Sequence, residues 1–163
     1  MKPQKIKTFL WYDGQAEEAA KFYTSLFDDS RILETTHYNE AHNEVAPGRA
    51  GSVLTVLFEL AGQQFVALNG GPEFQFTEAI SLQVECGSQE EVDTLWAKLT
   101  ADGGEEGPCG WLKDKYGVSW QIVPRRLFEL LDEGAPAQAE SVTKAMLGMH
   151  KLDIATLESA AKA

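Results

Sequence analysis

Two short stretches of the chain, Ile80–Cys86 and Val118–Val123, alternate apolar and polar residues, so that hydroxyl and amide groups lie on one side. Side chains of a β-strand point alternately to opposite faces, and the polar members of each stretch therefore share a face. We expect the apolar face to contact helices; its members are Ile80, Leu82, Val84, Val118, Trp120 and Ile122. The opposite face carries Ser81, Gln83, Glu85, Ser119 and Gln121. Hydroxyls and amides hydrogen-bond small polar molecules, whereas transition metals prefer imidazole, thiolate or carboxylate ligands.

Glu85 is the one carboxylate that this alternation places among the polar groups. A partly buried carboxylate can act as a general base toward a substrate C–H or O–H, which makes Glu85 a candidate catalytic residue. A solvated position at the end of a strand is the alternative. Cys109 has Lys113 nearby in the sequence, which would favour a reactive thiolate. A small core thiol is the alternative role for Cys109 and for Cys86.

The first half of the chain predicts the order strand, helix, strand, strand, strand. Apolar residues recur at helical spacing after the turn at Asp13–Gly14, and two β-rich runs joined by Ala61–Gly62–Gln63 indicate a hairpin. The expected strands are Ile6–Tyr12, Arg31–Asn39, Ser52–Leu60 and Gln64–Asn69, and the expected helix is Gln15–Phe27, with a loop at Ala41–Gly51.

The same order begins again after Gly70–Gly71–Pro72. Ile80–Cys86 reads as a strand, and Ser88 with Glu91 forms the pattern of a capping box at a helix start. Apolar residues then recur at i, i+3, i+4 and i+7 until Gly103–Gly104 ends the helix. The strands Trp111–Lys113 and Val118–Val123 flank a turn at Asp114–Gly117. The repeated order is the most informative feature of the chain.

The last part of the chain is helical in pattern, over Leu127–Leu131, Val142–Met149 and Leu157–Ala161, with Asp153 as an N-cap. We expect one α+β domain made of paired βαβββ modules with C-terminal helices. Its parts are residues 1–72 for the first module, 78–124 for the second and 125–163 for the helical extension.

Composition excludes several classes of partner. The chain has 163 residues and a net charge of −11, which repels phosphate backbones and anionic bilayers, so we expect neither a nucleic acid nor a membrane as a partner. No run approaches the roughly 20 apolar residues of a membrane helix. Two cysteines are too few for a disulfide framework. The sequence is typical of a cytoplasmic protein.

Several long motifs resemble one protein family. They are Leu10–Tyr23, Ala67–Pro72, Ala79–Val84, Cys109–Pro124 (CGWLKDKYGVSWQIVP) and the tail from Ala145. These stretches resemble the PhnB-like branch of the vicinal oxygen chelate (glyoxalase/bleomycin-resistance) superfamily, a branch labelled 3-demethylubiquinone-9 3-methyltransferase-like. The resemblance covers essentially the whole chain. It implies paired βαβββ modules whose sheets curve around a cavity, in a homodimer.

The resemblance also implies where a ligand would bind. Phe9 and Trp11 would then pack away from the cavity and leave Ile6, Thr8 and Leu10 on its side. Trp111 near the cavity mouth could stack on an apolar ligand. The expected small-molecule-binding residues are Thr8, Asn69, Ser81, Gln83, Glu85, Trp111, Ser119 and Gln121.

Metal-dependent members of the superfamily bind their ion with residues on the first, fourth, fifth and eighth strands. In this sequence those positions are Ile6 or Thr8, Leu68 or Asn69, Ser81 or Gln83, and Gln121. None is His, Asp or Glu, and amides and hydroxyls bind a transition metal poorly. We therefore expect no metal and no other cofactor.

The methyltransferase label conflicts with the sequence. A Rossmann-type methyltransferase has a glycine-rich turn after its first strand, whereas here that strand ends in Asp13–Gly14–Gln15–Ala16. The prediction is a small-molecule-binding protein without a metal. A lyase, isomerase or transfer enzyme that uses Glu85 or a bound water is one alternative, and a scaffold acting through the C-terminal helices is another.

Overall fold

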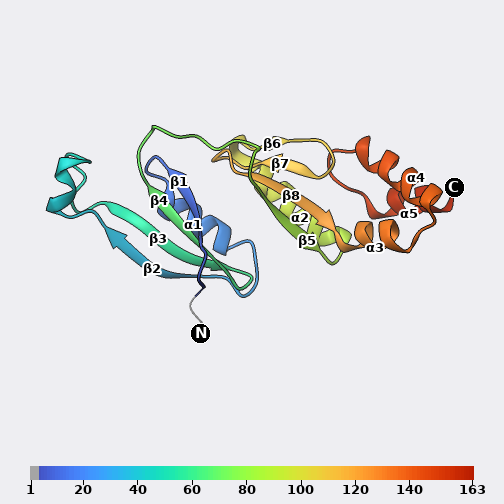
Figure 1. Cartoon of the computed structure of the whole chain (residues 1–163), viewed down its shortest axis with the longest axis horizontal. Helices are drawn as coiled ribbons and strands as arrows, with labels where there is room; N and C mark the ends of the chain where they lie inside the picture. Colours follow the sequence, from blue (N-terminus) through green and yellow to red (C-terminus); the bar gives the residue numbers. More distant parts are fainter. Residues whose placement is uncertain (1–3) are drawn as a thin grey trace. The chain divides into compact units, whose positions relative to one another are not determined.

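The computed structural model describes residues 4–163 and divides the chain into two compact units. The first unit ends at Gln75, and the second is Phe76–Ala163. Each unit contains one four-stranded mixed sheet with a helix, and the second also contains the C-terminal helices (Figure 1). The predicted fold class, α+β with two βαβββ modules and C-terminal helices, is confirmed. Within residues 4–163 no helix is both long and apolar enough to span a membrane.

The first unit follows the predicted order of elements. They are β1 (Thr8–Tyr12), α1 (Ala16–Thr24), β2 (Arg31–His37), β3 (Val53–Leu60) and β4 (Gln63–Asn69). The strand order is β1-β4-β3-β2, in which β1 is parallel to β4 and the other pairs are antiparallel. A short 3-10 turn, η1 (Glu40–Glu44), begins one residue before the predicted loop and ends within it.

The prediction for the two faces of β1 was wrong. Leu10 and Tyr12 are buried, whereas Phe9 is 60% exposed. The hydroxyl of Tyr12 lies 3.2 Å from that of Tyr23 on α1, which places the Leu10 side of the strand against the helix. Strand alternation therefore puts Thr8 on the helix side as well, and Phe9 and Trp11 on the other. Aromatic residues stand on both faces of this strand, so hydrophobicity alone could not decide between them.

The second unit repeats the order with one short extra turn. Its elements are β5 (Ser81–Cys86), α2 (Gln89–Thr100), η2 (Ala101–Gly103), β6 (Glu105–Glu106), β7 (Trp111–Lys113) and β8 (Ser119–Pro124). The strand order is β5-β8-β7-β6, and β5 is parallel to β8. Ser88 caps α2 as predicted, because its hydroxyl accepts a hydrogen bond from the Glu91 amide at 3.2 Å. β6 was not predicted, since two residues are too few to show alternation.

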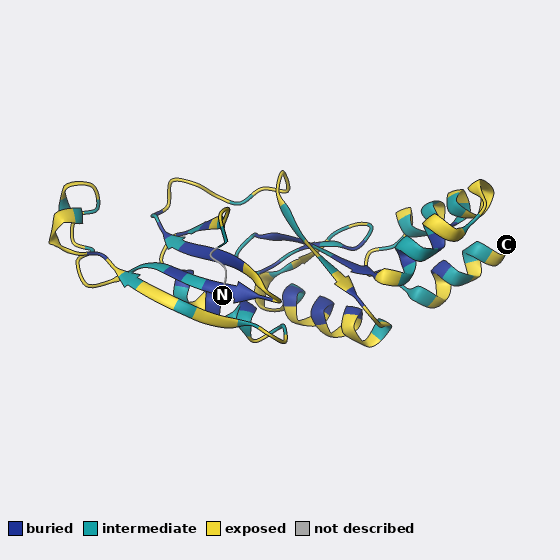
Figure 2. Cartoon of the chain, turned by 60° about the horizontal axis from the view of Figure 1, so that its bottom comes forward, coloured by how far each residue is buried: buried dark blue, intermediate teal, exposed yellow. Residues whose placement is uncertain are grey.

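One face of the second sheet packs on α2. Trp120 and Ile122 are buried on this face, as predicted, together with Leu112 and the α2 residues Leu95 and Leu99. Leu82 and Val84 are half-buried. Figure 2 shows how buried and exposed residues are distributed over the elements. The prediction that Ile80 joins them was wrong, because Ile80 precedes β5 and is 72% exposed. Buried Asp114 stabilises the turn between β7 and β8, because its carboxylate accepts hydrogen bonds from the amides of Tyr116 and Val118.

Three helices follow β8 directly: α3 (Arg125–Glu133), α4 (Pro136–Leu147) and α5 (Ile154–Lys162). Their shared core contains Leu127, Leu130, Val142, Leu152 and Leu157, and it extends to Val123 at the end of β8. Asp153 caps α5 as predicted, through a 2.7 Å hydrogen bond from the Thr156 amide. Arg126 on α3 forms ion pairs with Glu129 at 3.1 Å and with Glu158 on α5 at 2.9 Å, and both lie at the surface.

Candidate functional site

The face of the second sheet opposite α2, called here the open face, carries a row of polar side chains. The strand register pairs Ser81 with Ser119 and Gln83 with Gln121 between β5 and β8. It pairs Trp111 with Gln121 and Lys113 with Ser119 between β7 and β8. Paired residues point to the same side of a sheet. The structure therefore brings six of the expected site residues onto one face: Ser81, Gln83, Glu85, Trp111, Ser119 and Gln121.

Three of these side chains hydrogen-bond to one another. The Gln121 amide donates to the Ser81 hydroxyl at 2.8 Å, and the Gln83 amide donates to the Gln121 carbonyl oxygen at 3.3 Å. Gln121 on β8 thus hydrogen-bonds to two residues of the neighbouring strand β5. The middle of the open face is an ordered, neutral polar patch whose side chains largely satisfy each other.

Ser119 differs from its neighbours in this row. Its side chain is 1% exposed, and its hydroxyl has no hydrogen-bond partner among the described residues. A buried hydroxyl without a partner costs about 1–3 kcal/mol relative to a satisfied one, so such groups are rare. Ser119 also lines a pocket of about 410 Å³. The hydroxyl oxygen has almost no accessible surface, so a molecule in the pocket can hydrogen-bond it once a neighbouring side chain moves.

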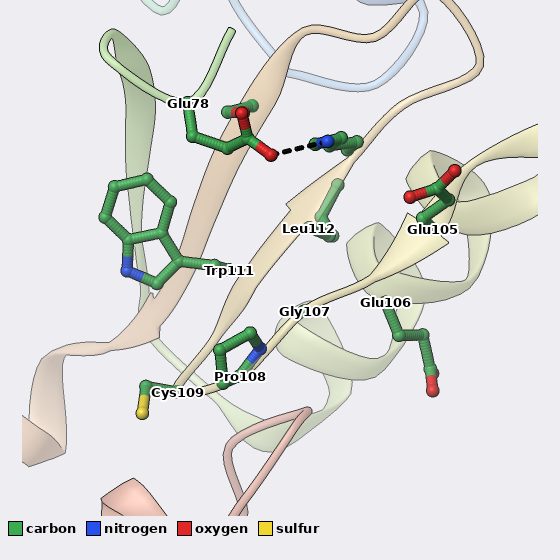
Figure 3. Close-up of a pocket in the computed structure, with 10 residues that line it drawn as sticks. Glu78, Glu105, Glu106, Gly107, Pro108, Cys109, Trp111 and Leu112 are labelled. Carbon is green, nitrogen blue, oxygen red and sulfur yellow. Dashed lines mark ion pairs between the residues drawn. The ribbon is translucent and has the colours of Figure 1, made fainter.

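The pocket lies along β6 and β7 and the segment that joins them (Figure 3). The residues that line it are Glu78, Glu105, Glu106, Gly107, Pro108, Cys109, Trp111, Leu112, Lys113 and Ser119. All belong to the second unit. Trp111, Pro108 and Leu112 supply apolar surface, and the acidic residues Glu78, Glu105 and Glu106 supply polar groups. This mixture of apolar walls with a few polar groups is the usual composition of a small-molecule site.

An ion pair stands at the wall of the pocket. Lys113 Nζ lies 2.5 Å from Glu78 Oε1, and both side chains are exposed, at 37% and 59%. The hydrogen bond from Lys113 lowers the pKa of Glu78, and the same contact raises the pKa of Lys113. Both groups are therefore charged at neutral pH. Because water screens an exposed pair, it can open at little cost to admit a ligand.

Glu85 shares the open face but not the pocket. Its carboxylate accepts a hydrogen bond from Arg125 at 2.7 Å, and its side chain is 49% exposed. An exposed carboxylate in an ion pair fits the alternative of a solvated residue at a strand end. Glu85 is also not the only carboxylate on this face, which corrects the prediction. The register pairs Glu105 with Lys113, so Glu105 points to the same side.

Thr8 and Asn69, the two expected site residues of the first unit, lie on the helix-facing side of its sheet. The register pairs Tyr12 with Asn69, which is buried. Asn69 Oδ1 accepts from the Ala16 amide at 2.9 Å, and its Nδ2 donates to the Val53 carbonyl at 3.1 Å. The Asn69 amide therefore joins the start of α1 to β3 and has a structural use.

The pocket contains residues that the sequence did not single out as ligand-binding, above all Glu78, Glu105 and Glu106. The segment 105–108 follows a helix and contains only a two-residue strand, so no periodic pattern marked its direction. Glu106 is tied to α2, because its carboxylate accepts the Trp96 indole N–H at 2.6 Å. The signal in the sequence that could have indicated these residues was the adjacent pair Glu105 and Glu106, shortly before the strand that begins at Trp111.

The donors on the open face do not suit the metal that the superfamily implies. The side chains at the expected positions of the second unit are hydroxyls and amides, and the Ser81–Gln121–Gln83 hydrogen bonds already occupy them. Among residues 4–163, no group of three or more His, Cys, Asp or Glu residues is arranged to hold a metal ion.

The sequence matches a family model over residues 4–123, and that model describes 3-demethylubiquinone-9 3-methyltransferase. The chain belongs to this family. A PhnB protein from Bacillus cereus, described with the same methyltransferase name, is 43% identical. The alignment covers 74% of this chain and 99% of that one, with a TM-score of 0.64. The predicted resemblance to the PhnB-like branch is confirmed.

Two more distant structures share the fold of this chain. A protein from Pseudomonas aeruginosa is 16% identical over 75% of this chain and 98% of that one, with a TM-score of 0.58. The fosfomycin resistance protein FosX from Listeria monocytogenes is 16% identical over 79% of this chain and 97% of that one, with a TM-score of 0.50. At this identity the likeness shows the fold alone. A comparison with curated proteins found no match.

Proposed function

We propose that this protein binds a small molecule in the pocket beside β7, with no metal. The observation that carries the proposal is Ser119, which lines the pocket and whose buried hydroxyl has no partner in the described chain. A ligand that hydrogen-bonds this hydroxyl recovers the free energy that its burial costs. The indole of Trp111 supports the proposal, since it offers a rigid apolar surface in the same pocket.

An enzyme of lyase, isomerase or transfer type that uses Glu85 has less support. The Glu85 carboxylate pairs with Arg125, and Glu85 does not line the pocket. Methyl transfer, which the family description names, also has little support, because residues 4–163 form two mixed four-stranded sheets and not the doubly wound parallel sheet with a glycine-rich turn of Rossmann-type methyltransferases. The homodimer stays a prediction, which light scattering during size-exclusion chromatography would check.

A thermal-shift screen of a metabolite library tests the proposal, with wild type and Ser119→Ala compared. A ligand at 100 times its Kd stabilises the folded protein by about 2.7 kcal/mol, which such a screen detects. We expect compounds that stabilise wild type and stabilise Ser119→Ala much less. The shifts should survive dialysis against a chelator, because no metal takes part.

The matched control is Ser81→Ala on the same face. The Ser119 hydroxyl has no hydrogen bond to lose, so Ser119→Ala without ligand should be as stable as wild type or slightly more stable. Ser81→Ala loses the bond from Gln121 and should cost about 1 kcal/mol while leaving ligand shifts intact. Hits that stabilise Ser119→Ala as strongly as wild type would show that the pocket is not the site, and a screen without hits would count against binding.

A further inference from the structure

The charged groups that line the pocket do not balance. Three acidic residues, Glu78, Glu105 and Glu106, and one lysine, Lys113, line it. Glu78 and Lys113 neutralise each other in their ion pair. Glu106 pairs with Leu112 in the register and its carboxylate accepts the Trp96 indole N–H of α2, so it points to the helix side of the sheet. The Glu105 carboxylate has neither an ion pair nor a hydrogen bond in the part of the chain that the structure describes. One negative charge, that of Glu105, therefore remains without an ion pair at the pocket, on a chain whose net charge is −11.

These carboxylates do not form a metal site. Among the described residues no three acidic, histidine or cysteine side chains are arranged around a common point. Charges that are spread along a wall attract a cation of organic size, which does not need several oxygens at coordination distance. An anionic ligand would be repelled by the same wall.

The apolar part of the pocket suits a cation as well. The indole of Trp111 lies beside the Glu78–Lys113 pair and lines the pocket (Figure 3). The face of an indole attracts organic cations, which is how aromatic sites recognise amines. Ser119 adds a buried acceptor oxygen without a partner in the described chain. A protonated amine has N–H donors for such an oxygen, and its carbon body can lie on Trp111.

We infer that the ligand of this pocket is a small protonated amine with an apolar body. The inference rests on the proposed function and specifies the class of ligand. The acidic wall selects the positive charge, Trp111 holds the apolar body, and the Ser119 hydroxyl accepts an N–H of the ammonium group. Lys113 is paired with Glu78 and lies opposite Glu105 in the strand register, so its single positive charge offsets only part of their two negative charges.

Three probes with one ring and different charge test the class: benzylammonium, benzyl alcohol and benzoate. Each is titrated into 15N-labelled protein, and the Trp111 indole N–H and the amides of residues 105–113 and 119 are followed by NMR. Benzylammonium should bind about fivefold or more tightly than benzyl alcohol, and benzoate should bind most weakly. The preference for the cation should shrink in about 0.5 M salt, since salt screens the wall.

Glu105→Gln and Glu90→Gln form a matched pair, because both remove one exposed carboxylate and only Glu105 lines the pocket. Glu105→Gln should weaken benzylammonium about threefold and leave benzyl alcohol unchanged, whereas Glu90→Gln should change neither. If the three probes bind equally well, or if Glu105→Gln has no effect on benzylammonium, the ligand class is wrong and the pocket still binds. If no probe shifts the pocket amides and the metabolite screen finds no ligand that depends on Ser119, the proposed function fails as well.

Discussion

The carboxylate of Asp114 accepts the indole N–H of Trp120 at 2.9 Å, and both residues are buried. The same carboxylate accepts the amides of Tyr116 at 2.9 Å and Val118 at 3.1 Å. Three N–H groups thus converge on one acidic side chain, which closes the turn between β7 and β8. Trp111, Lys113 and Ser119 of the pocket stand on the two strands that this turn joins.

Asp114→Asn should destabilise the protein by about 2–3 kcal/mol in urea unfolding. An amide accepts hydrogen bonds through only one of its two end atoms, so its NH2 group would face either the indole N–H or the backbone amides. Asp132→Asn, at an exposed position of α3, is the control and should change stability by less than about 0.5 kcal/mol. If the interaction is direct, Trp120→Phe should cost less in the Asp114→Asn background than in wild type. Equal stability of Asp114→Asn and wild type would contradict this account.

The two cysteines should differ in reactivity. Burial raises the pKa of the Cys86 thiol to about 12, whereas Cys109 is half-buried at the pocket. At pH 8 only about one Cys86 thiol in ten thousand would be a thiolate, and the thiolate is the reactive form. A thiol reagent should therefore label one cysteine per native chain, and mass spectrometry should locate the label at Cys109. Cys109→Ala should abolish the labelling of the native protein. Fast labelling of both thiols in native protein would contradict the burial of Cys86.

Gly110 should tolerate alanine less well than Gly103. Both have positive φ, +83° and +107°, so alanine is strained at either position by roughly 1–2 kcal/mol. At Gly103 an added Cβ meets nothing within 4 Å. At Gly110 it would lie 2.9 Å from the Ile122 carbonyl oxygen and 3.0 Å from a Leu152 methyl, so overpacking adds to the strain. We expect Gly110→Ala to cost about 1–3 kcal/mol more than Gly103→Ala in denaturant unfolding. Equal losses of stability in the two variants would show that the atoms around Gly110 shift easily to accept the added methyl group.

The cap of α5 should depend on pH. Hydrogen bonds from the hydroxyl and amide of Thr156 lower the pKa of Asp153, so the ionised form is the stabilising one. Its contribution is complete above the unfolded pKa, about 3.9, and is lost as the pH falls through the lower folded pKa. Asp153→Ala should cost about 1 kcal/mol at pH 7 and progressively less below pH 4.

Asp153→Asn is the matched variant for this cap, because asparagine caps a helix without titrating. Its stability relative to Asp153→Ala should not change with pH, and hydrogen exchange of the Thr156 amide reports the cap directly. A constant difference between wild type and Asp153→Ala from pH 7 to pH 3 would contradict the assignment.

Local patterns predicted much of this fold. Alternation placed Ser81, Gln83, Ser119 and Gln121 on one face, and the structure pairs them there. Cap chemistry predicted the start of α2 at Ser88 and of α5 after Asp153. These features depend on neighbours in the chain, so the residues that produce them are adjacent in the sequence. The same reasoning failed for the first strand. Phe9 and Leu10 are both apolar, and only the packing against α1 determines which of them lies on the buried face.

The sequence by itself determined the repeated order of strand and helix, the family and the polar character of the second sheet, since periodicity and long motifs are properties of the chain. Only the tertiary structure decided which polar groups satisfy each other and which do not. Ser81 and Ser119 are the same residue type at the same place in the alternation, yet Gln121 donates to Ser81 and leaves Ser119 buried without a partner among the described residues. The register that brings Gln121 beside Ser81 joins β5 and β8, which are far apart in the sequence, so local patterns could not reveal this difference.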